Sequence, residues 1–389
     1  MRPLEGRRLW FVGIGGAGLS AYAFLARAWG AEVGGWDRIE TPYLRGLEGI
    51  DVEIAPEPVG RDGWELVVST AYAGSVPGRP RAELLAELVS LRRSIVVAGA
   101  HGKTTTTAMI AFALAELGHD PAWLIGGEVP QLGRNAGAGD GWLVVEGDES
   151  DRTVAQLRPE IGVVTNVELD HHATFATEAE VAELFDAWLE RAPHVVRGWE
   201  LEPVGFELAV PGEHNRRNAA AALAALELAG VDRAAAERAL AAFEGVGRRF
   251  EVVGEAAGVT VVDDYAHHPS EIAAAVAAAR ERTAGRVLVL FQPHLYSRTL
   301  HLAHEFGEAL SAADAACVTE IYRAREEPVD GVSGKLVLDA LQPGVRAGWA
   351  PTVEDGVRVI RAWAREGDLV LTLGAGDVDR AARELLEQP

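Results

Sequence analysis

The chain has 389 residues, 48% of them hydrophobic, so it is long enough for two or three domains that each bury a core. A net charge of −22 disfavours nucleic acids and anionic membrane surfaces as partners. A single cysteine, Cys317, excludes an internal disulfide framework, and the sequence has neither a membrane-spanning apolar run nor a secretory leader, so we expect a cytoplasmic protein without membrane insertion.

The first predicted segment is a βαβ unit built around a glycine-rich turn. A strand over Leu9–Val12 leads into the turn, and a helix over Leu19–Trp29 follows it. The turn has the spacing G-x-G-x-x-G, from Gly13, Gly15 and Gly18. A second strand ends at Asp37. In this context the pattern predicts a dinucleotide or nucleoside-diphosphate site, although many such turns bind nothing.

A further apolar strand, Glu65–Val68, ends in Ser69 and Thr70. The carboxyl ends of strands in an open parallel sheet are where ligands bind, so both residues are candidates for the same site. A helix over Arg81–Leu91 then leads to the next segment.

The second segment begins with an apolar run, a turn over Gly99–Gly102, and a helix that starts with Lys103 and four threonines. Lys103 is one of only two lysines, although the chain has 36 basic residues, which indicates a position where an arginine would not serve. The turn has the short form G-x-x-G-K-T of a phosphate-binding loop, in which Lys103 reaches the β/γ-phosphates and Thr104 binds Mg²⁺. An ordinary strand-to-helix turn is the alternative.

Two later strands end in clusters of polar residues. The strand Trp142–Val145 is followed by four acids within six residues, namely Glu146, Asp148, Glu149 and Asp151. Such a cluster is expected where a cation is held opposite a phosphate loop, or in a solvated acidic loop. The strand Ile161–Thr165 leads into acids and histidines that predict a second metal or a γ-phosphate contact: Glu168, Asp170, His171 and His172.

The third segment follows two predicted helices, Asn218–Ala229 and Arg233–Phe243, and has four predicted strands. Their ranges are Val259–Val262, Arg286–Phe291, Ala315–Thr319 and Leu369–Leu373. Polar side chains follow the first two strands, among them Asp264, Tyr265, His267, His268, His294, Tyr296 and Arg298. We expect a small doubly wound domain whose loops complete an active site.

Taken together, these motifs resemble those of the Mur ligases, and within that family the branch that adds L-alanine. The resemblance implies an α/β fold of three domains. A Rossmann-like domain that binds a UDP-linked substrate covers residues 1–95, a P-loop ATPase-like domain covers 96–247, and a Rossmann-like domain that closes over ATP and the amino acid covers 248–389.

The resemblance also implies roles for individual residues. ATP would be bound by Gly99, His101, Gly102, Lys103, Thr104, Thr105, His214, Asn215, Arg249 and Asp264. Mg²⁺ would be bound by Thr104, Glu146 and His171, with Glu168 beside His171. The substrates UDP-N-acetylmuramate and L-alanine would contact Gly15, Gly16, Ala17, Gly18, Ser20, Asp37, Ser69, Tyr265, Tyr296 and Arg298. Lys103, His171, His267, His294 and Arg298 would act in catalysis, with either His267 or His294 as the base. The chain would act as a monomer or a homodimer.

The implied reaction activates the lactyl carboxylate with ATP as an acyl phosphate, which the amine of L-alanine then attacks. The chain departs from the family pattern in three places. It lacks a piece between Ala192 and Val210 and a smaller one near Gly74–Pro80, and Leu295 stands where the family has an arginine. A homologue that binds a UDP-sugar or nucleotide as a regulator is therefore a second hypothesis, as is a ligase for another amino acid or a muropeptide.

Overall fold

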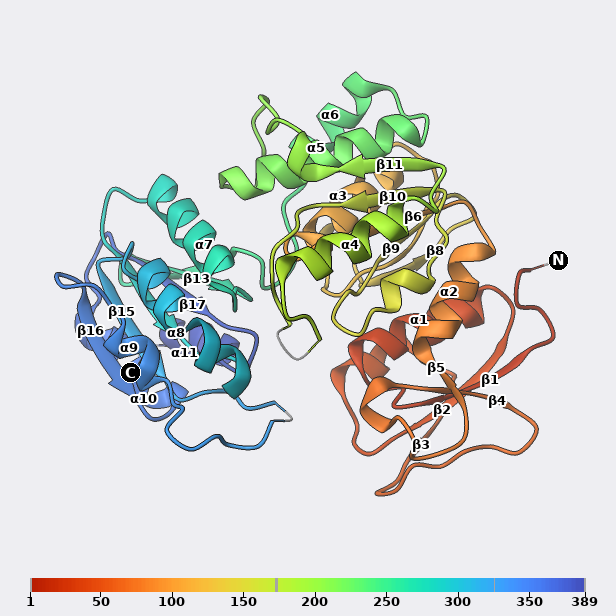
Figure 1. Cartoon of the computed structure of the whole chain (residues 1–389), viewed down its shortest axis with the longest axis horizontal. Coiled ribbons are helices and arrows are strands. Elements are labelled where there is room, and N and C mark those ends of the chain that lie inside the picture. The colour runs from red at the N-terminus through yellow and green to blue at the C-terminus, as the bar shows by residue number, and fades with distance from the viewer. Residues whose placement is uncertain (1, 172–173, 325, 388–389) are drawn as a thin grey trace. The chain divides into compact units, whose positions relative to one another are not determined.

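The structure is a computed structural model that describes residues 2–171, 174–324 and 326–387. The chain forms two compact units. The first comprises residues 1–168, 177–207 and 217–243, and the second comprises residues 169–176, 208–216 and 244–389. The first unit contains two mostly parallel sheets and the second contains one, as the α/β prediction requires (Figure 1).

The N-terminal sheet of the first unit is entirely parallel, with the strand order β3-β2-β1-β4-β5. The order reverses between β1 and β4, so a crevice is expected beyond the carboxyl ends of these two strands. The strands are β1 (Arg8–Val12), β2 (Glu32–Asp37), β3 (Asp51–Ile54), β4 (Glu65–Val68) and β5 (Arg79–Pro80), and the helices are α1 (Ala17–Ala28) and α2 (Arg81–Ser90).

The second sheet of this unit has the order β11-β10-β6-β9-β7-β8, in which only the β7–β8 pair is antiparallel. The strands are β6 (Ser94–Ala98), β7 (Ala122–Leu124), β8 (Ala136–Ala138), β9 (Leu143–Glu146), β10 (Ile161–Val164) and β11 (His194–Arg197). The helices are α3 (Lys103–Glu116), α4 (Glu178–Leu189), α5 (Glu213–Leu228) and α6 (Arg233–Ala241), although residues 213–216 of α5 belong to the second unit. Because β6 lies between β9 and β10, the loops after these three strands meet at one edge of the sheet.

The second unit has the order β12-β13-β17-β14-β15-β16, with only the β12–β13 pair antiparallel. Its strands are β12 (Glu251–Ala256), β13 (Val259–Asp264), β14 (Val287–Phe291), β15 (Ala315–Thr319), β16 (Arg346–Ala350) and β17 (Leu369–Leu373). Its helices are α7 (Pro269–Arg282), α8 (Tyr296–Leu310), α9 (Lys335–Asp339), α10 (Val353–Trp363) and α11 (Asp379–Leu386).

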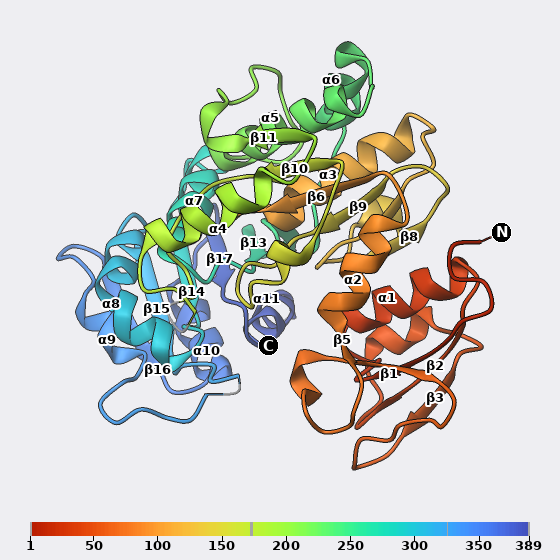
Figure 2. The same ribbon diagram turned by 45° about the vertical axis from the view of Figure 1, so that its right-hand side comes forward.

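Two apolar clusters cover the two faces of this sheet. One contains residues of α7, α8 and α9, such as Val276 and Phe306, and the other contains residues of α10 and α11, such as Ile360 and Ala381. Figure 2 shows these five helices around the strands of the sheet. Helices on both faces of a mostly parallel sheet are the doubly wound arrangement that the sequence predicts. The free Cys317 lies on β15, where burial raises the pKa of its thiol to about 12.

The predicted boundary of one helix is wrong. The sequence prediction starts the alanine-rich helix at Asn218, but α5 starts at Glu213, so His214 and Asn215 lie in its first turn. Pro211 and Gly212, the latter at φ +95°, set the start of the helix, and the acidic Glu213 is favourable at a helix N-terminus.

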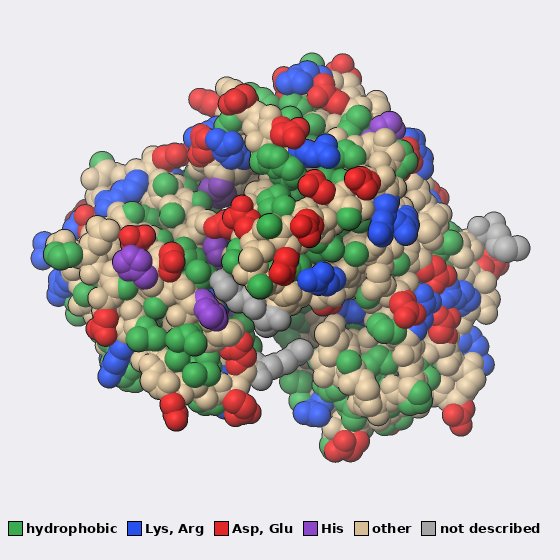
Figure 3. All heavy atoms as spheres, viewed as in Figure 1, with side chains coloured by type: hydrophobic (Ala, Val, Ile, Leu, Met, Phe, Trp, Pro, Cys, Tyr) green, Lys and Arg blue, Asp and Glu red, His purple; other side chains and the backbone are tan. Residues whose placement is uncertain are grey.

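Acidic side chains are spread over the visible surface of both units, consistent with the net charge of −22 (Figure 3). Among the described residues, none of the helices has the length and apolar character needed to cross a bilayer.

Candidate active site

The glycine-rich turn after β1 is held against β2 and β4. The amide of Gly15 donates to Asp37 Oδ2 at 2.7 Å, and the Thr41 hydroxyl donates to the Gly15 carbonyl at 2.7 Å. A Cβ on Gly13, which has φ +90°, would lie 2.7 Å from Ser69 Oγ. The structure therefore brings the predicted Gly15, Asp37 and Ser69 together at the reversal point of the sheet.

The remaining predicted residues of this turn lie at the start of α1. Gly16 precedes the helix, Ala17 and Gly18 begin it, and no side chain caps it. The Ser20 hydroxyl is turned inward and donates to the Ala17 carbonyl at 3.1 Å. The Ser20 hydroxyl is thus hydrogen-bonded within the helix. The uncapped amides of the first turn are suited to bind an anionic group.

The loop predicted to bind phosphate lies between β6 and α3. Gly99 has φ +128° and Gly102 has φ +78°, both in regions that favour glycine. A Cβ on Gly99 would lie 2.2 Å from Thr165 Oγ1, and one on Gly102 would lie 2.2 Å from Asn218 Oδ1. No side chain caps α3, so its first amides are available to an anion. The loop is a tightly packed cradle that only glycine permits at these two positions.

Gly99→Ala should therefore reduce the free energy of unfolding by about 2–4 kcal/mol, because a strained backbone and an overpacked side chain combine. Urea unfolding followed by circular dichroism measures this change. Gly118→Ala is the matched control: Gly118 follows α3 at φ +74° with open space around its Cα, so only the backbone strain of about 1 kcal/mol applies. Equal losses in the two variants would contradict the close packing of the loop.

Lys103 is the first residue of α3, and its ammonium is held inside the loop. Its Nζ donates to the carbonyls of Gly99 at 2.6 Å and Ala100 at 3.1 Å, and to Glu149 Oε1 at 2.8 Å. Burial would lower the pKa of Lys103, but the Glu149 carboxylate and its hydrogen bond outweigh burial, so the pKa is raised. The lysine is thus charged and positioned beside the uncapped helix end.

Thr104 and Glu146 form the start of an oxygen-lined site. The Thr104 hydroxyl donates to Glu146 Oε2 at 2.9 Å, and the amide of Gly126 donates to the other carboxylate oxygen at 2.5 Å. A hydroxyl and a carboxylate at the mouth of a phosphate loop are hard oxygen ligands that suit Mg²⁺. These residues of the first unit therefore fit the predicted cation.

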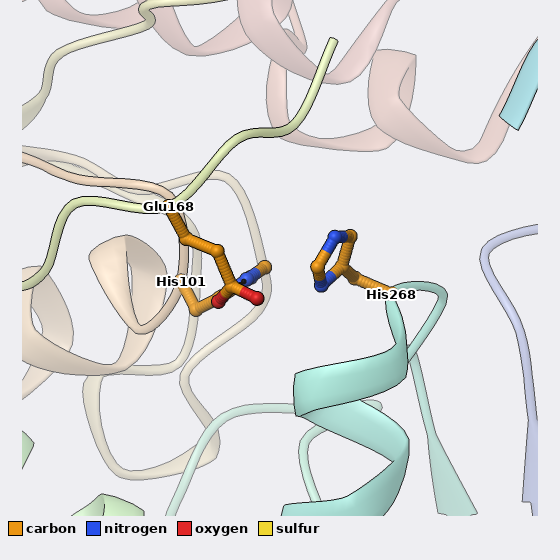
Figure 4. A group of neighbouring side chains, drawn as sticks. All are labelled: His101, Glu168 and His268. Carbon is orange, nitrogen blue, oxygen red and sulfur yellow. Dashed lines mark ion pairs between the residues drawn. The ribbon is translucent and has the colours of Figure 1, made fainter. Parts of the chain in front are cut away.

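The end of β10 closes the other side of the loop. Asn166 accepts the amide of His101 at 2.9 Å and donates to its carbonyl at 2.9 Å, and Glu168 Oε2 lies 2.9 Å from His101 Nε2. Figure 4 shows the His101 and Glu168 side chains directed toward each other. His101 is thus fixed through both its backbone and its ring. Glu168 belongs to the first unit whereas His171 belongs to the second, so their joint metal role stays a prediction.

In the second unit, the end of β13 holds a buried carboxylate. Asp264 accepts the amides of Phe250 and Ala266, each at 2.7 Å. Burial raises the pKa of Asp264 to about 6, although Arg249 and the two amides oppose this effect. Asp264 and Arg249, both predicted to bind ATP, therefore lie close enough to interact. Asn215 donates to the Pro211 carbonyl at 2.7 Å, and burial lowers the pKa of His214.

Aromatic rings line the carboxyl edge of this sheet. The His267 ring lies edge-on to the rings of Tyr265 and His294, with ring centroids 5.3 and 5.9 Å apart. The His294 ring stacks on Tyr322, with centroids 5.7 Å apart. Tyr296 is the first residue of α8 and follows His294 by two residues. The structure thus groups both candidate bases, His267 and His294, with Tyr265.

Burial, the neighbouring His267 and Arg298 lower the pKa of His294 to about 3. Its ring should stay neutral between pH 5 and 8, as ¹⁵N NMR of the imidazole can show. The unfolded chain would take up this proton near pH 6.5, so the contribution of His294 to stability falls as the pH drops from about 6.5 to about 3. His294→Asn should therefore make unfolding less sensitive to pH in this interval. Protonation of His294 near pH 6.5 would contradict this prediction.

Arg298, in the first turn of α8, binds a carboxylate of its own unit. Its Nε and Nη2 donate to Asp170 Oδ1 at 3.2 and 2.9 Å, and Nη2 also reaches Oδ2 at 3.1 Å. Both side chains are buried. The Arg298 fork predicted to bind the carboxylate of L-alanine is thus engaged by Asp170 in the free protein. His171 follows Asp170 at φ +58°, and His172 lies outside the described residues.

Sequence reasoning missed specific partners of the predicted residues. Glu149 lies within the acidic run but was not assigned to Lys103, and Asp170 was not assigned to Arg298. The partners are separated from their cations by 46 and 128 residues, and only the acidic character of the strand ends pointed to them.

Comparisons with known proteins show the family to which the chain belongs. A family model described as the Mur ligase middle domain matches residues 97–196, and one described as the glutamate ligase domain of Mur ligases matches residues 248–376. The UDP-N-acetylmuramate–L-alanine ligase of Rubrobacter xylanophilus is 40% identical over 442 aligned positions, which cover 96% of this chain and 98% of that protein. The Streptomyces coelicolor ligase of the same name is 38% identical over 446 positions, covering 97% and 96%.

A solved structure of a ligase is also similar to this chain over nearly its whole length. The UDP-N-acetylmuramate–alanine ligase of Thermotoga maritima superposes with a TM-score of 0.79 at 28% identity, covering 97% of this chain and 98% of that one. The 442 positions aligned with the Rubrobacter xylanophilus protein exceed the 389 residues of this chain, so that relative has residues without a counterpart here.

Proposed function

Because the chain belongs to the Mur ligase family, we propose that it joins L-alanine to the lactyl carboxylate of UDP-N-acetylmuramate at the expense of ATP, in peptidoglycan synthesis. The observation that carries this proposal is similarity over nearly the whole chain to ligases of that name, together with a loop in which Lys103 lies beside the uncapped start of α3. The regulator hypothesis is not favoured by these comparisons.

The phosphate loop provides the ATP-binding part of the proposed site. The amides that follow Gly102 receive the phosphate oxygens, and the Lys103 ammonium turns from the loop carbonyls to the β/γ-phosphates. Thr104 and Glu146 of the first unit and His171 of the second would hold Mg²⁺. When bound, the ion neutralises charge on the phosphoryl oxygens.

The remaining residues would bind the other substrates and the nucleoside. The backbone amides of Gly15–Gly18 bind the UDP pyrophosphate at the start of α1. Asp37 and Ser69 lie at the same edge of the sheet. The nucleoside of ATP would be bound by four residues of the second unit: Asp264, Arg249, His214 and Asn215. The amino acid would be bound by Tyr265, Tyr296 and Arg298. Its carboxylate would replace the Asp170 carboxylate as the hydrogen-bond partner of Arg298.

The proposed reaction first gives the lactyl carboxylate a good leaving group. An oxygen of the lactyl carboxylate attacks the γ-phosphorus, the bond to the β-phosphate oxygen breaks, and ADP leaves with an acyl phosphate remaining. The neutral amine of L-alanine then attacks the acyl carbon and phosphate departs. Lys103 offsets the negative charge of the transferring group throughout, and the expected exclusion of water protects the acyl phosphate.

The proposed substrates also suggest where the chain works. ATP and UDP-linked sugars are cytoplasmic metabolites, so we place the reaction in the cytoplasm. A monomer or a homodimer is compatible with it, because all the residues assigned above come from one chain.

Phosphate release by the purified protein tests the proposal, with Mg·ATP, UDP-N-acetylmuramate and L-alanine each omitted in turn. Release that requires all three components is the expected result. Glycine and L-serine in place of L-alanine measure the amino-acid preference. Tight binding of UDP-N-acetylmuramate without phosphate release would instead support the regulator.

A further inference from the structure

Glu271 contacts His267 in two ways at the start of α7. Its Oε2 accepts the backbone amide of His267 at 2.9 Å and lies 3.2 Å from His267 Nδ1. Both residues are mostly buried in the second unit. Resting on the proposed function, we infer that Glu271 is a positioning residue that makes His267, and not His294, the base that deprotonates the amine of L-alanine.

The contacts of the ring define which nitrogen carries hydrogen. Nδ1 lies 3.1 Å from the Tyr265 carbonyl oxygen and 3.2 Å from Glu271 Oε2, and both oxygens can only accept. Nδ1 must therefore be the donor. In a neutral imidazole this leaves the lone pair on Nε2, which is the arrangement a general base needs. A carboxylate on the opposite nitrogen also stabilises the imidazolium that forms when Nε2 takes a proton.

The second candidate base, His294, has a cation beside its Nδ1, because Arg298 Nη1 lies 3.4 Å away. A nearby guanidinium disfavours the protonated ring, and the pKa of His294, lowered to about 3 mainly by burial, agrees with this. Proton transfer from an ammonium to so weak a base is unfavourable.

A purely structural role for Glu271 is the alternative. Glu271 occupies the third position of α7, where a glutamate often accepts a backbone amide just before the helix. Glutamine serves equally well in this capping role, since its carbonyl oxygen also accepts. The contact with Nδ1 is the part that capping does not explain, and a glutamine variant separates the two roles.

The charged and titratable groups around His267 decide how its environment responds to pH. Tyr265 lies two residues before His267 and Glu271 four residues after it. The His294 ring lies 5.9 Å from the His267 ring, and Asp170 interacts with His267 through charge. Arg249 and Arg298 contact the neighbours Glu271 and His294. Arg249 Nη1 lies 3.7 Å from Glu271 Oε1, so the carboxylate is shared between one cation and the His267 ring.

The ammonium of L-alanine gives one proton to His267 Nε2, and the freed lone pair forms the bond to the acyl carbon. The bond between that carbon and the phosphate oxygen then breaks, with its electron pair staying on the phosphate. The second proton of the nitrogen leaves with the phosphate, which is released as hydrogen phosphate, and His267 returns its proton to water.

Glu271→Gln in the full chain tests this inference. We expect kcat for L-alanine-dependent phosphate release to fall about tenfold to a hundredfold, with the KM for ATP unchanged. The acid limb of the pH profile of kcat/KM should move to lower pH, because the imidazolium loses its neighbouring carboxylate. The thermal midpoint should stay the same, since glutamine keeps the cap. ¹⁵N NMR should show His267 with its hydrogen on Nδ1 in the wild type and a mixture of tautomers in the variant.

Glu308→Gln is the matched control, because Glu308 forms an i,i+4 contact of 3.4 Å with the exposed His304 on α8. It should leave the rate and the pH profile unchanged. A Glu271→Gln enzyme with the wild-type rate and profile, or a wild-type His267 with its hydrogen on Nε2, would overturn the inference while wild-type turnover persists. Failure of the proposed function itself would appear differently, as a wild-type protein without phosphate release.

Discussion

Lys103→Arg should lower kcat by about a hundredfold to a thousandfold, although the positive charge is kept. The Lys103 ammonium fits among two loop carbonyls and Glu149 at distances of 2.6–3.1 Å. A guanidinium is larger, planar and fixed in its donor geometry, so it cannot fill this space and also reach the β/γ-phosphates. Steady-state phosphate release with saturating substrates measures the effect.

The chain offers a matched control for this variant. Lys335 is the only other lysine, lies on the surface of the second unit, and has its ammonium 4.3 Å from the centre of the Trp349 ring. Lys335→Arg should leave kcat unchanged, because an arginine also stacks on an aromatic ring. Near-normal turnover by Lys103→Arg would remove the phosphate-loop assignment.

Arg298→Ala should reduce the free energy of unfolding by about 3–5 kcal/mol, because it leaves the Asp170 carboxylate buried without its partner. Burial alone would raise the pKa of Asp170, but Arg298, His171 and His267 together hold it well below its ordinary value. The stabilisation is therefore present above about pH 4 and is lost as the pH falls below it. Urea unfolding at pH 7 and at pH 3 measures both parts of this prediction.

The surface pair Arg380–Glu354, at 2.9 Å, is the comparison for this buried pair. Arg380→Ala should cost no more than about 1 kcal/mol, since solvent screens exposed ion pairs. The double variant Asp170→Asn/Arg298→Ala should recover part of the lost stability, because no unpaired charge remains buried. An Arg298→Ala loss as small as that of Arg380→Ala would contradict a stabilising role for the pair.

The sequence patterns predicted the strands of the sheets well, and they placed the candidate site residues after those strands. Strands such as Val287–Phe291 are continuous apolar runs with turn residues after them, which identifies buried parallel strands and places their polar ends at one edge. Gly99 and Gly102 were recognisable because a phosphate loop needs their backbone freedom, and both have positive φ in the structure.

Shorter or less regular elements escaped prediction for physical reasons. Strands β7 and β8 have only three residues each, too few to show an alternating pattern. The four-residue β11, His194–Arg197, lies at the edge of its sheet and was not predicted. The pair Arg298–Asp170 joins residues 128 positions apart, and local patterns contain no information about such pairing. For the same reason, the sequence predicts Arg298 as a substrate ligand without revealing its internal carboxylate partner.

The most direct test of the proposed reaction follows oxygen. UDP-N-acetylmuramate with ¹⁸O in both oxygens of its lactyl carboxylate is incubated with the protein, Mg·ATP and L-alanine, and the products are analysed by mass spectrometry. An acyl phosphate intermediate predicts one ¹⁸O in each released phosphate and one in the new alanyl amide. Unlabelled phosphate, or labelled phosphate without the alanyl product, would contradict the proposed ligase reaction.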